Sequence, residues 1–179
     1  MSSERDFTIT GGRTVFTGYV FRVEVQDVAY ADGTQVTRDV VCHPGAAAIV
    51  AYDDEAVYLI RQPRPAIADP DSLELPAGLL DVEGEAPLGA AQRELAEEIG
   101  RGADHWEFVR SFRPSVGISN EQTHIFAATG LRPASADSGE DERIEVVAWP
   151  LDDLDGALEA VQDSKTVIGL MWLRERLGG

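Results

Sequence analysis

The pattern of apolar and polar positions predicts a helix between Pro87 and Ile99. Its apolar members stand three or four positions apart, at Leu88, Ala91, Leu95 and Ile99. Side chains at this spacing share one face of a helix and can bury it. Pro87 suits the first turn, where a helix requires no backbone N–H. This helix is the element around which the rest of the chain is expected to be organised.

Shorter apolar runs on both sides of the helix have the pattern of β-strands. Thr14–Pro44 is expected to form antiparallel strands, because Ala31–Thr34 carries the Asp-Gly signal of a hairpin. Later elements are expected as strands at Ala46–Val50, Val57–Ile60, Ser72–Leu75, Glu107–Phe112, Gln122–Ala128 and Ile144–Trp149, and as helices at Pro150–Val161 and Asp163–Leu177. This order predicts an α+β fold in which a mixed sheet has the Pro87–Ile99 helix on one side and the C-terminal helix on the other.

The N-terminal strands are expected to form a separate part of the molecule. A short meander buries little apolar surface by itself. Residues 1–44 are therefore expected to pack on the main domain, residues 45–179, on a partner subunit, or on both.

Composition excludes several classes of protein. The chain has 179 residues and a net charge of −17, which argues against nucleic acid and anionic membranes as partners. It contains no apolar run long enough to cross a membrane, and its start lacks the apolar segment of a signal peptide. The single Cys42 excludes an internal disulfide framework and fits a reducing cytoplasm, where we expect it to be a core residue.

Three glutamates lie on another face of the expected helix. Glu94, Glu97 and Glu98 stand at i, i+3 and i+4, so their carboxylates are neighbours and repel one another. A divalent cation would offset this repulsion. Hard oxygen ligands, with no Cys or His nearby, point to Mg²⁺ or Mn²⁺ rather than zinc. Arg93 is adjacent and is expected to hold one glutamate in place.

The stretch Gly78–Arg101, GLLDVEGEAPLGAAQRELAEEIGR, resembles the Nudix box. That pattern is Gly, five residues, Glu, seven residues, then Arg-Glu-aliphatic-X-Glu-Glu-X-Gly-aliphatic. Glu85 and the segment from Arg93 to Gly100 match it. Two departures are present: six residues separate Gly78 from Glu85, and Arg101 replaces the final aliphatic residue. The extra residue lengthens a loop and leaves the helical spacing unchanged, so the metal site is expected to persist.

Much more of the chain resembles one branch of this family, the ADP-ribose pyrophosphatases. The resemblance runs from Thr14 through the segment DSKTVIGLMWL near the C-terminus. The segment LPAGLLDVEGE is similar to the sequence found in an actinobacterial variety of that branch. It implies a Nudix fold (an α/β/α sandwich) and metal-dependent hydrolysis of ADP-ribose to AMP and ribose 5-phosphate, with two or three Mg²⁺ or Mn²⁺ ions per site. It also implies a homodimer in which the N-terminal strands cross to the other subunit.

The resemblance assigns roles to individual residues. For the substrate, Phe21 or Tyr19 matches the residue that stacks on adenine. Arg38 matches an arginine supplied across the dimer, and Arg64 matches an arginine that contacts the substrate. Glu74 is also expected among the substrate-binding residues. For the metal ions, the carbonyl of Ala77 and the carboxylates of Glu94 and Glu98 are the expected ligands, with Glu97 in support. For catalysis, Glu140 is the expected general base and Glu142 an additional metal ligand, although the two roles could be exchanged. Glu121 is a third candidate, for substrate binding or catalysis. Arg93 is also counted among the catalytic residues.

Other functions stay open. The mid loop reads Pro114-Ser115-Val116-Gly117, whereas the branch usually has a proline directly before the glycine. A nucleotide sugar such as GDP-mannose, or a flavin or nicotinamide dinucleotide, is therefore an alternative substrate. An alternative of another class is a sensor that binds ADP-ribose without cleaving it. Such proteins typically lose a box glutamate or the arginine, and this chain has all of them.

Overall fold

The structure is a computed structural model that describes residues 5–135 and 143–178. The chain divides into two compact units. The first contains the chain up to Pro44 together with Arg113–Gln122, and the second contains Gly45–Phe112 and the chain from Thr123 onward. The 113–122 loop belongs to the first unit, a grouping that the sequence pattern did not predict.

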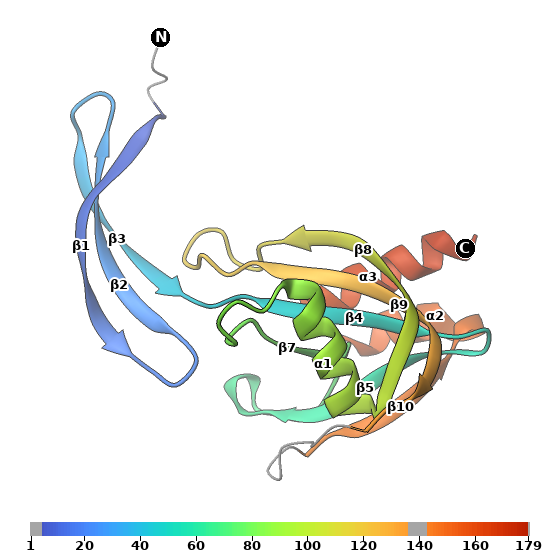
Figure 1. The fold of residues 1–179 in the computed structure, drawn as a ribbon. Coiled ribbons are helices and arrows are strands. Elements are labelled where there is room, and N and C mark those ends of the chain that lie inside the picture. The colour runs from blue at the N-terminus through green and yellow to red at the C-terminus, as the bar shows by residue number, and fades with distance from the viewer. Residues whose placement is uncertain (1–4, 136–142, 179) are drawn as a thin grey trace. The chain divides into compact units, whose positions relative to one another are not determined.

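The first unit is a three-stranded antiparallel sheet in the order β1-β2-β3 (Figure 1). Its strands are β1 (Phe7–Thr17), β2 (Arg22–Tyr30) and β3 (Gln35–Cys42). Gly33 has a positive φ of 89° in the hairpin turn, as the Asp-Gly signal predicted. The 113–122 loop joins β3 through backbone hydrogen bonds, in which Val41 donates to Ile118 at 2.7 Å and accepts from Asn120 at 3.1 Å.

Strand β1 begins at Phe7, earlier than the pattern predicted. Every residue of β1 is exposed in the single chain. The strand therefore has no buried face, and its sequence shows no clean alternation of apolar and polar positions. Its pairing with β2 from Phe7 to Thr17 is what establishes it as a strand.

The second unit contains the mixed sheet that the sequence predicted. Its strand order is β10-β5-β4-β9-β8, with β6 paired to β5 and β7 paired to β4. Strands β4 and β9 are parallel, and the other pairs are antiparallel. The strands are β4 (Ala46–Tyr52), β5 (Ala56–Arg64), β6 (Asp69–Glu74), β7 (Ala77–Leu79), β8 (Arg101–Phe112), β9 (Thr123–Pro133) and β10 (Glu145–Pro150), with the short 3₁₀ helix η1 (Pro65–Ile67) between β5 and β6.

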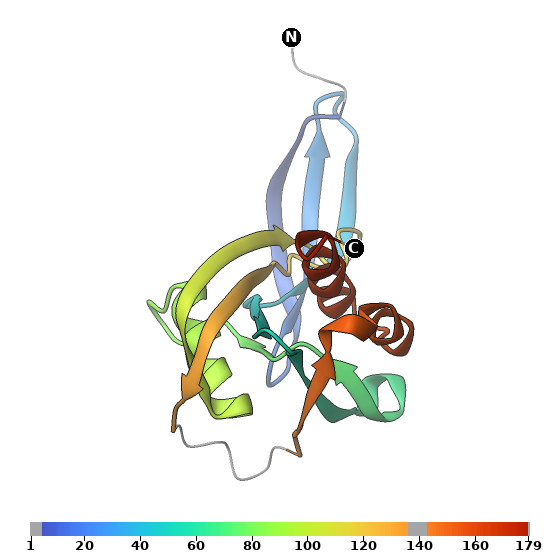
Figure 2. The ribbon, with the colours of Figure 1, turned by 90° about the vertical axis from the view of Figure 1, so that its right-hand side faces the viewer.

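Helices cover both faces of this sheet (Figure 2). Helix α1 (Pro87–Ile99) packs on one face through Ala90, Ala91 and Leu95, against alternate residues of β4. Helices α2 (Leu154–Ala160) and α3 (Ser164–Arg176) pack on the other face through Leu154, Leu170 and Leu173. The arrangement confirms the predicted sandwich. Strand β4 is buried on both faces, which is why its sequence is continuously apolar.

The predicted helix bounds are largely confirmed. Helix α1 has the predicted bounds, and Gly100 ends it in the left-handed region at φ 68°. Asp163 caps α3, since its side chain accepts from the backbone N–H of Thr166. The helix expected at Pro150–Val161 is instead the 3₁₀ turn η2 (Leu151–Asp153) followed by α2.

Strand β8 begins at Arg101 rather than Glu107. The added segment, Arg101–Trp106, has no regular alternation of apolar and polar side chains, so apolar periodicity does not predict it. Its strand conformation comes from pairing with the end of β9, where Arg101 lies opposite Pro133. No helix in the described part of the chain is long and apolar enough to span a membrane.

A close contact between α3 and the sheet gives a test of the packing. A Cβ at Gly169 would lie 2.5 Å from Cδ1 of Leu75 and 2.9 Å from Cγ2 of Val50. We expect Gly169→Val to force the helix from the sheet and lower the free energy of unfolding by about 1–3 kcal/mol, measured by urea denaturation. Valine has a higher helix propensity than glycine, so propensity cannot explain a loss at this position. Met171→Val is the control, because it places the same β-branched side chain at a half-exposed position of the same helix. Equal destabilisation by both variants would contradict this packing.

Candidate active site

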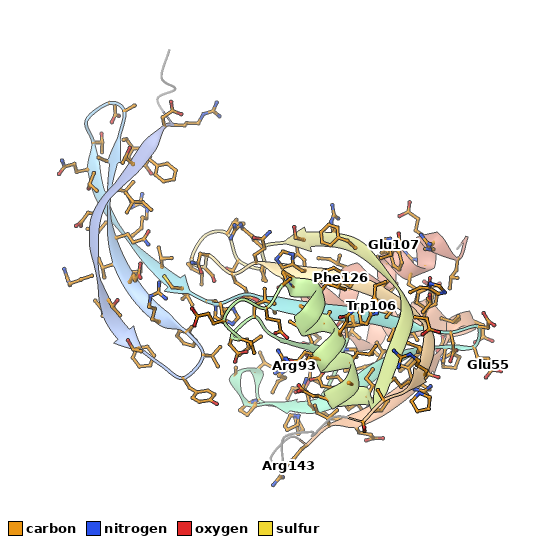
Figure 3. The ribbon with its side chains drawn as sticks, viewed as in Figure 1. Glu55, Arg93, Trp106, Glu107, Phe126 and Arg143 are labelled. Atoms are coloured by element: carbon orange, nitrogen blue, oxygen red, sulfur yellow. The ribbon has the colours of Figure 1, made fainter. Side chains whose placement is uncertain are left out.

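The three glutamates lie together on α1, as the helical spacing predicted. Glu94 is almost buried, at 9% exposure, whereas Glu97 and Glu98 are partly exposed. Arg93 lies among them on the same helix (Figure 3). Its Nη1 donates to Oε1 of Glu94 and, at 3.1 Å, to Oε2 of Glu97. A guanidinium that bridges two carboxylates offsets the repulsion that their spacing creates.

Arg93 also reaches the loop before the helix. Its Nη2 lies 3.2 Å from Oε2 of Glu85, and its Nε lies 3.3 Å from Oε1 of the same carboxylate. Nη2 donates to the carbonyl of Leu79 at 3.4 Å as well. The hydrogen bonds that Arg93 donates to Glu85, together with the charge of Glu94 and the hydrogen bonds to Glu94 and Glu97, raise the pKa of Arg93, so it stays positively charged.

Arg93 contacts more glutamates than the sequence predicted. The prediction was that it holds one glutamate, and the structure shows ion pairs with three: Glu85, Glu94 and Glu97. Glu85 was not among the predicted site residues. The available signal was the position of Glu85 in the box pattern, because that fixed spacing brings the loop carboxylate back to the arginine.

Gly78 is required by the position of Glu94. A Cβ built at Gly78 would overlap the carboxylate of Glu94, so only glycine allows the loop and the helix to approach this closely. The adjacent Ala77 donates its backbone N–H to Oε2 of Glu98 at 2.8 Å. Loop and helix are thus joined at two glutamates. The six-residue separation of Gly78 from Glu85 does not disturb these contacts, and the loop turns at Gly84, where φ is 79°.

Arg101, the second departure from the box pattern, also has a structural explanation. It is the first residue of β8, and its guanidinium stacks 4.6 Å from the ring centroid of Tyr58. A cation on an aromatic face covers apolar surface as an aliphatic side chain would. The departure therefore leaves the glutamate cluster intact.

The donors of the cluster fit a hard divalent cation. The carboxylates of Glu94 and Glu98 lie against the segment 77–78, and carboxylate oxygens suit Mg²⁺ or Mn²⁺. Among the described residues, no group of three or more His, Cys, Asp or Glu side chains is arranged to hold a metal ion by itself. The glutamates would supply only part of a coordination shell, since Mg²⁺ in proteins usually keeps several waters and binds substrate phosphates as well.

A second charged cluster lies beside the first. Glu74, at the end of β6, is 3% exposed and accepts from Nε of Arg64 at 2.6 Å and from Nη2 at 2.7 Å. Lys165 of α3 donates to Oε2 of Glu74 at 2.7 Å. Burial by itself raises the pKa of Glu74, but the hydrogen bonds from Arg64 and the ammonium of Lys165 outweigh it and lower the pKa to about 2. The charge of Glu98 contributes to raising the pKa of Arg64.

The predicted site residues of the second unit thus form three groups of contacting residues. Arg93 binds Glu94 and Glu97, Ala77 binds Glu98, and Arg64 binds Glu74. Glu74 was predicted to be one of the substrate-binding residues. In the structure both of its carboxylate oxygens accept from side chains of the protein, which makes it a support for Arg64.

The other candidates belong elsewhere. Phe21, Tyr19, Arg38 and Glu121 lie in the first unit. Tyr19 is fully exposed, and the ring of Phe21 lies 6.0 Å from that of Phe16. Arg38, on β3, donates to the carbonyl of Thr37 at 2.8 Å. Glu140 and Glu142, the candidates for base and additional ligand, lie outside the described residues, so their roles remain predictions.

The lowered pKa of Glu74 predicts a specific acid sensitivity. A folded-state pKa near 2, against an ordinary value of 4.5, stabilises the protein above pH 4.5, by at most about 3 kcal/mol, and this contribution is lost as the pH falls toward 2. Glu74→Gln removes it. We expect the difference in unfolding free energy between wild type and this variant to shrink between pH 4.5 and 2, measured by urea denaturation at several pH values. Glu159→Gln, at an exposed position of α2, is the control. A difference independent of pH would refute the assignment.

Comparison with known proteins identifies the family. The model of the NUDIX domain matches residues 42–170. The chain is 38% identical over 149 residues to an ADP-ribose pyrophosphatase of Mycobacterium tuberculosis, covering 82% of this chain and 72% of that protein. It is 34% identical over 168 residues to a methanol dehydrogenase activator of Bacillus methanolicus, covering 89% and 88%.

A solved structure agrees with these relatives. The crystal structure of an ADP compounds hydrolase superposes with a TM-score of 0.86 at 29% identity, covering 99% of this chain and 97% of that one. The match therefore includes the N-terminal strands, which lie outside the family model. With its Arg93-centred glutamate cluster, the chain belongs to the Nudix hydrolases, in the branch that contains the ADP-ribose pyrophosphatases.

Proposed function

We propose that this protein hydrolyses the diphosphate of ADP-ribose and releases AMP and ribose 5-phosphate. The observation that carries the proposal is the glutamate face of α1, held by Arg93 and fitted against Gly78. Relatives named for ADP-ribose hydrolysis, from Mycobacterium tuberculosis and Bacillus subtilis, support the choice of substrate.

The same residues would bind the metal ions that the reaction requires. Nudix hydrolases generally need divalent cations, and we propose two or three Mg²⁺ or Mn²⁺ ions here. Glu94, Glu98 and the carbonyl of Ala77 would hold them, with Glu97 in support and Glu142 as an additional ligand. When bound, such ions neutralise charge on the diphosphate and acidify the attacking water.

The protein's own groups have distinct tasks in this proposal. Arg93 keeps the carboxylates oriented and separated, and its ion pairs leave it engaged with the glutamates rather than with the substrate. Arg64 is the cation that binds a phosphate oxygen. The base that takes the proton from water would lie outside α1, because the α1 carboxylates would be occupied as metal ligands. We propose Glu140, with Glu142 and Glu121 as the other candidates.

We also propose a homodimer, formed through the N-terminal sheet. The first unit exposes large apolar side chains, among them Phe7, Ile9, Val15, Phe16, Tyr19, Val116 and Ile118. Exposed apolar surface of this kind marks an interaction site in a stable protein. Phe21 or Tyr19 would then stack on adenine, and Arg38 would reach the substrate of the partner subunit. A reducing, cytoplasmic setting fits Cys42, the only cysteine, which is buried.

The dimer proposal has a direct test. We expect Ile9→Asp, which places a charge on the exposed apolar surface of β1, to convert a dimer into a monomer, measured by light scattering after size-exclusion chromatography. Thr8→Asp is the matched control, because Thr8 is a polar residue of the same exposed strand. A wild-type monomer, or a dimer that persists in the Ile9 variant, would contradict the proposed interface.

Chromatographic product analysis tests the activity. The wild-type protein with Mg²⁺ is expected to release AMP from ADP-ribose faster than it cleaves GDP-mannose, NADH or FAD. We expect Glu98→Gln, which keeps an acceptor for the Ala77 N–H but removes the charge, to lower kcat by about 10²-fold or more. Glu159→Gln, which removes an exposed charge on α2, is expected to retain activity.

The outcomes separate the alternatives. Preference for GDP-mannose or a dinucleotide would keep the metal site and overturn the choice of substrate. Tight binding of ADP-ribose without cleavage of any compound would identify a sensor. Full activity of Glu98→Gln would overturn the site itself.

A further inference from the structure

The chain has one lysine, and that lysine is nearly buried. That residue is Lys165, and all other basic side chains of the chain, apart from histidine, are arginines. The side chain of Lys165 is 13% exposed, whereas lysines in proteins are mostly on the surface. Burial of the only ammonium requires partners that compensate for its lost hydration.

Two carboxylates supply that compensation. Nζ of Lys165 lies 2.7 Å from Oε2 of Glu74 and 2.9 Å from Oδ2 of Asp163. A compact ammonium has three donors, so it can donate to both carboxylates at once. Asp163 is itself fixed, because it accepts from the backbone N–H of Thr166 at 3.0 Å and from its hydroxyl at 2.6 Å.

The same helix end is anchored to the strand that carries Glu74. The hydroxyl of Thr166 accepts from the backbone N–H of Leu75 at 2.8 Å, and Thr166 is fully buried. Lys165 and Glu74 are therefore held from both sides, by α3 and by the end of β6. The position of the ammonium is set by buried contacts and leaves little freedom to Glu74.

Glu74 in turn fixes Arg64. It accepts from both Nε and Nη2, and such a two-point contact sets the plane of the guanidinium. Within the described part of the chain, no residue accepts a hydrogen bond from Nη1 of Arg64, and the side chain is 42% exposed. One edge of the guanidinium is thus held by the protein, and the other is accessible to a ligand oxygen.

Charge counting shows what the lysine adds. Arg64 and Lys165 carry two positive charges, and Glu74 and Asp163 carry two negative charges, so the cluster is locally neutral. Without Lys165 the cluster would carry one net negative charge. Arg64 would then be the only cation for two carboxylates, and Glu74 would lose the ammonium that holds its Oε2 in place.

From this arrangement we infer that Lys165 is a positioning residue for the substrate. It holds Glu74, and Glu74 presents the free edge of Arg64 to a phosphate of the substrate. The inference rests on the proposed function and adds a role for the last helix of the chain. Arg64 contacts the substrate, whereas Lys165 acts only through Glu74 and Arg64.

A double-mutant cycle tests this role. Lys165→Met keeps most of the length of the side chain and removes its ammonium group. Arg64→Gln removes the cation through which Lys165 is inferred to act. We expect Lys165→Met alone to raise KM for ADP-ribose about tenfold with kcat changed less than about twofold, because an interaction made equally in ground and transition states affects binding only.

In the Arg64→Gln background the same substitution is expected to change KM less than about twofold, since its effect passes through the arginine. Arg174→Met is the matched control. It removes one positive charge from the same helix, where Arg174 is 41% exposed and pairs with Asp155. Its KM is expected to stay at the wild-type value. Thermal unfolding of each variant shows that the fold is retained.

The outcomes distinguish this inference from the proposed activity. An equal effect of Lys165→Met in both backgrounds, or an unchanged KM, would overturn the inference and leave the activity standing. A loss confined to kcat would do the same. If the wild type binds ADP-ribose without cleaving it, the proposed activity fails, and the same cycle measured on the dissociation constant of ADP-ribose decides the role of Lys165.

Discussion

The repulsion among carboxylates on α1 is the constraint on which the site depends. Glu94 and Glu97 lie within one turn of the helix, and Glu85 approaches from the preceding loop. A single guanidinium contacts all three, because its planar fork has several donors pointing in different directions. Arg93 thereby allows an acidic surface to form on a helix that would otherwise be destabilised by like charges.

The fold supports this surface through the segment from Glu74 to Gly78. Its backbone is held at successive positions: Leu75 by Thr166 of α3, Pro76 by Ile49 of β4, and Ala77 by Glu98 of α1. Both helical layers and the central strand therefore contact one short stretch of chain. The close approach at Gly78 places that stretch directly against Glu94.

The placement of a few charges, rather than the net charge, decides whether this protein can attract a diphosphate. A net charge of −17 produces a field that disfavours phosphate compounds, and screening by salt limits it to short distances. Near the site, Arg64 is held with its guanidinium partly exposed, and cations bound at the glutamate face would add positive charge. Attraction of a diphosphate is therefore a local property, which depends on how a few charges are placed.

The sequence by itself determined the features that depend on local spacing. The bounds of α1, the shared face of its glutamates and the continuously apolar β4 follow from helical and strand periodicity, and the structure confirms each. The turn at Gly33 follows from local backbone preference. The resemblance to the Nudix box indicated what the glutamate face of α1 is for, because the box residues are those that hold divalent cations in that family.

Tertiary structure alone decided the features that depend on distant residues. Glu74 and Lys165 are 91 positions apart, and only the packing of α3 on the sheet brings them together. The start of β8 depends on pairing with β9, and β1 has no buried face to create a pattern. Periodicity reports which face of an element is buried; which polar side chains then meet is set by how the elements pack.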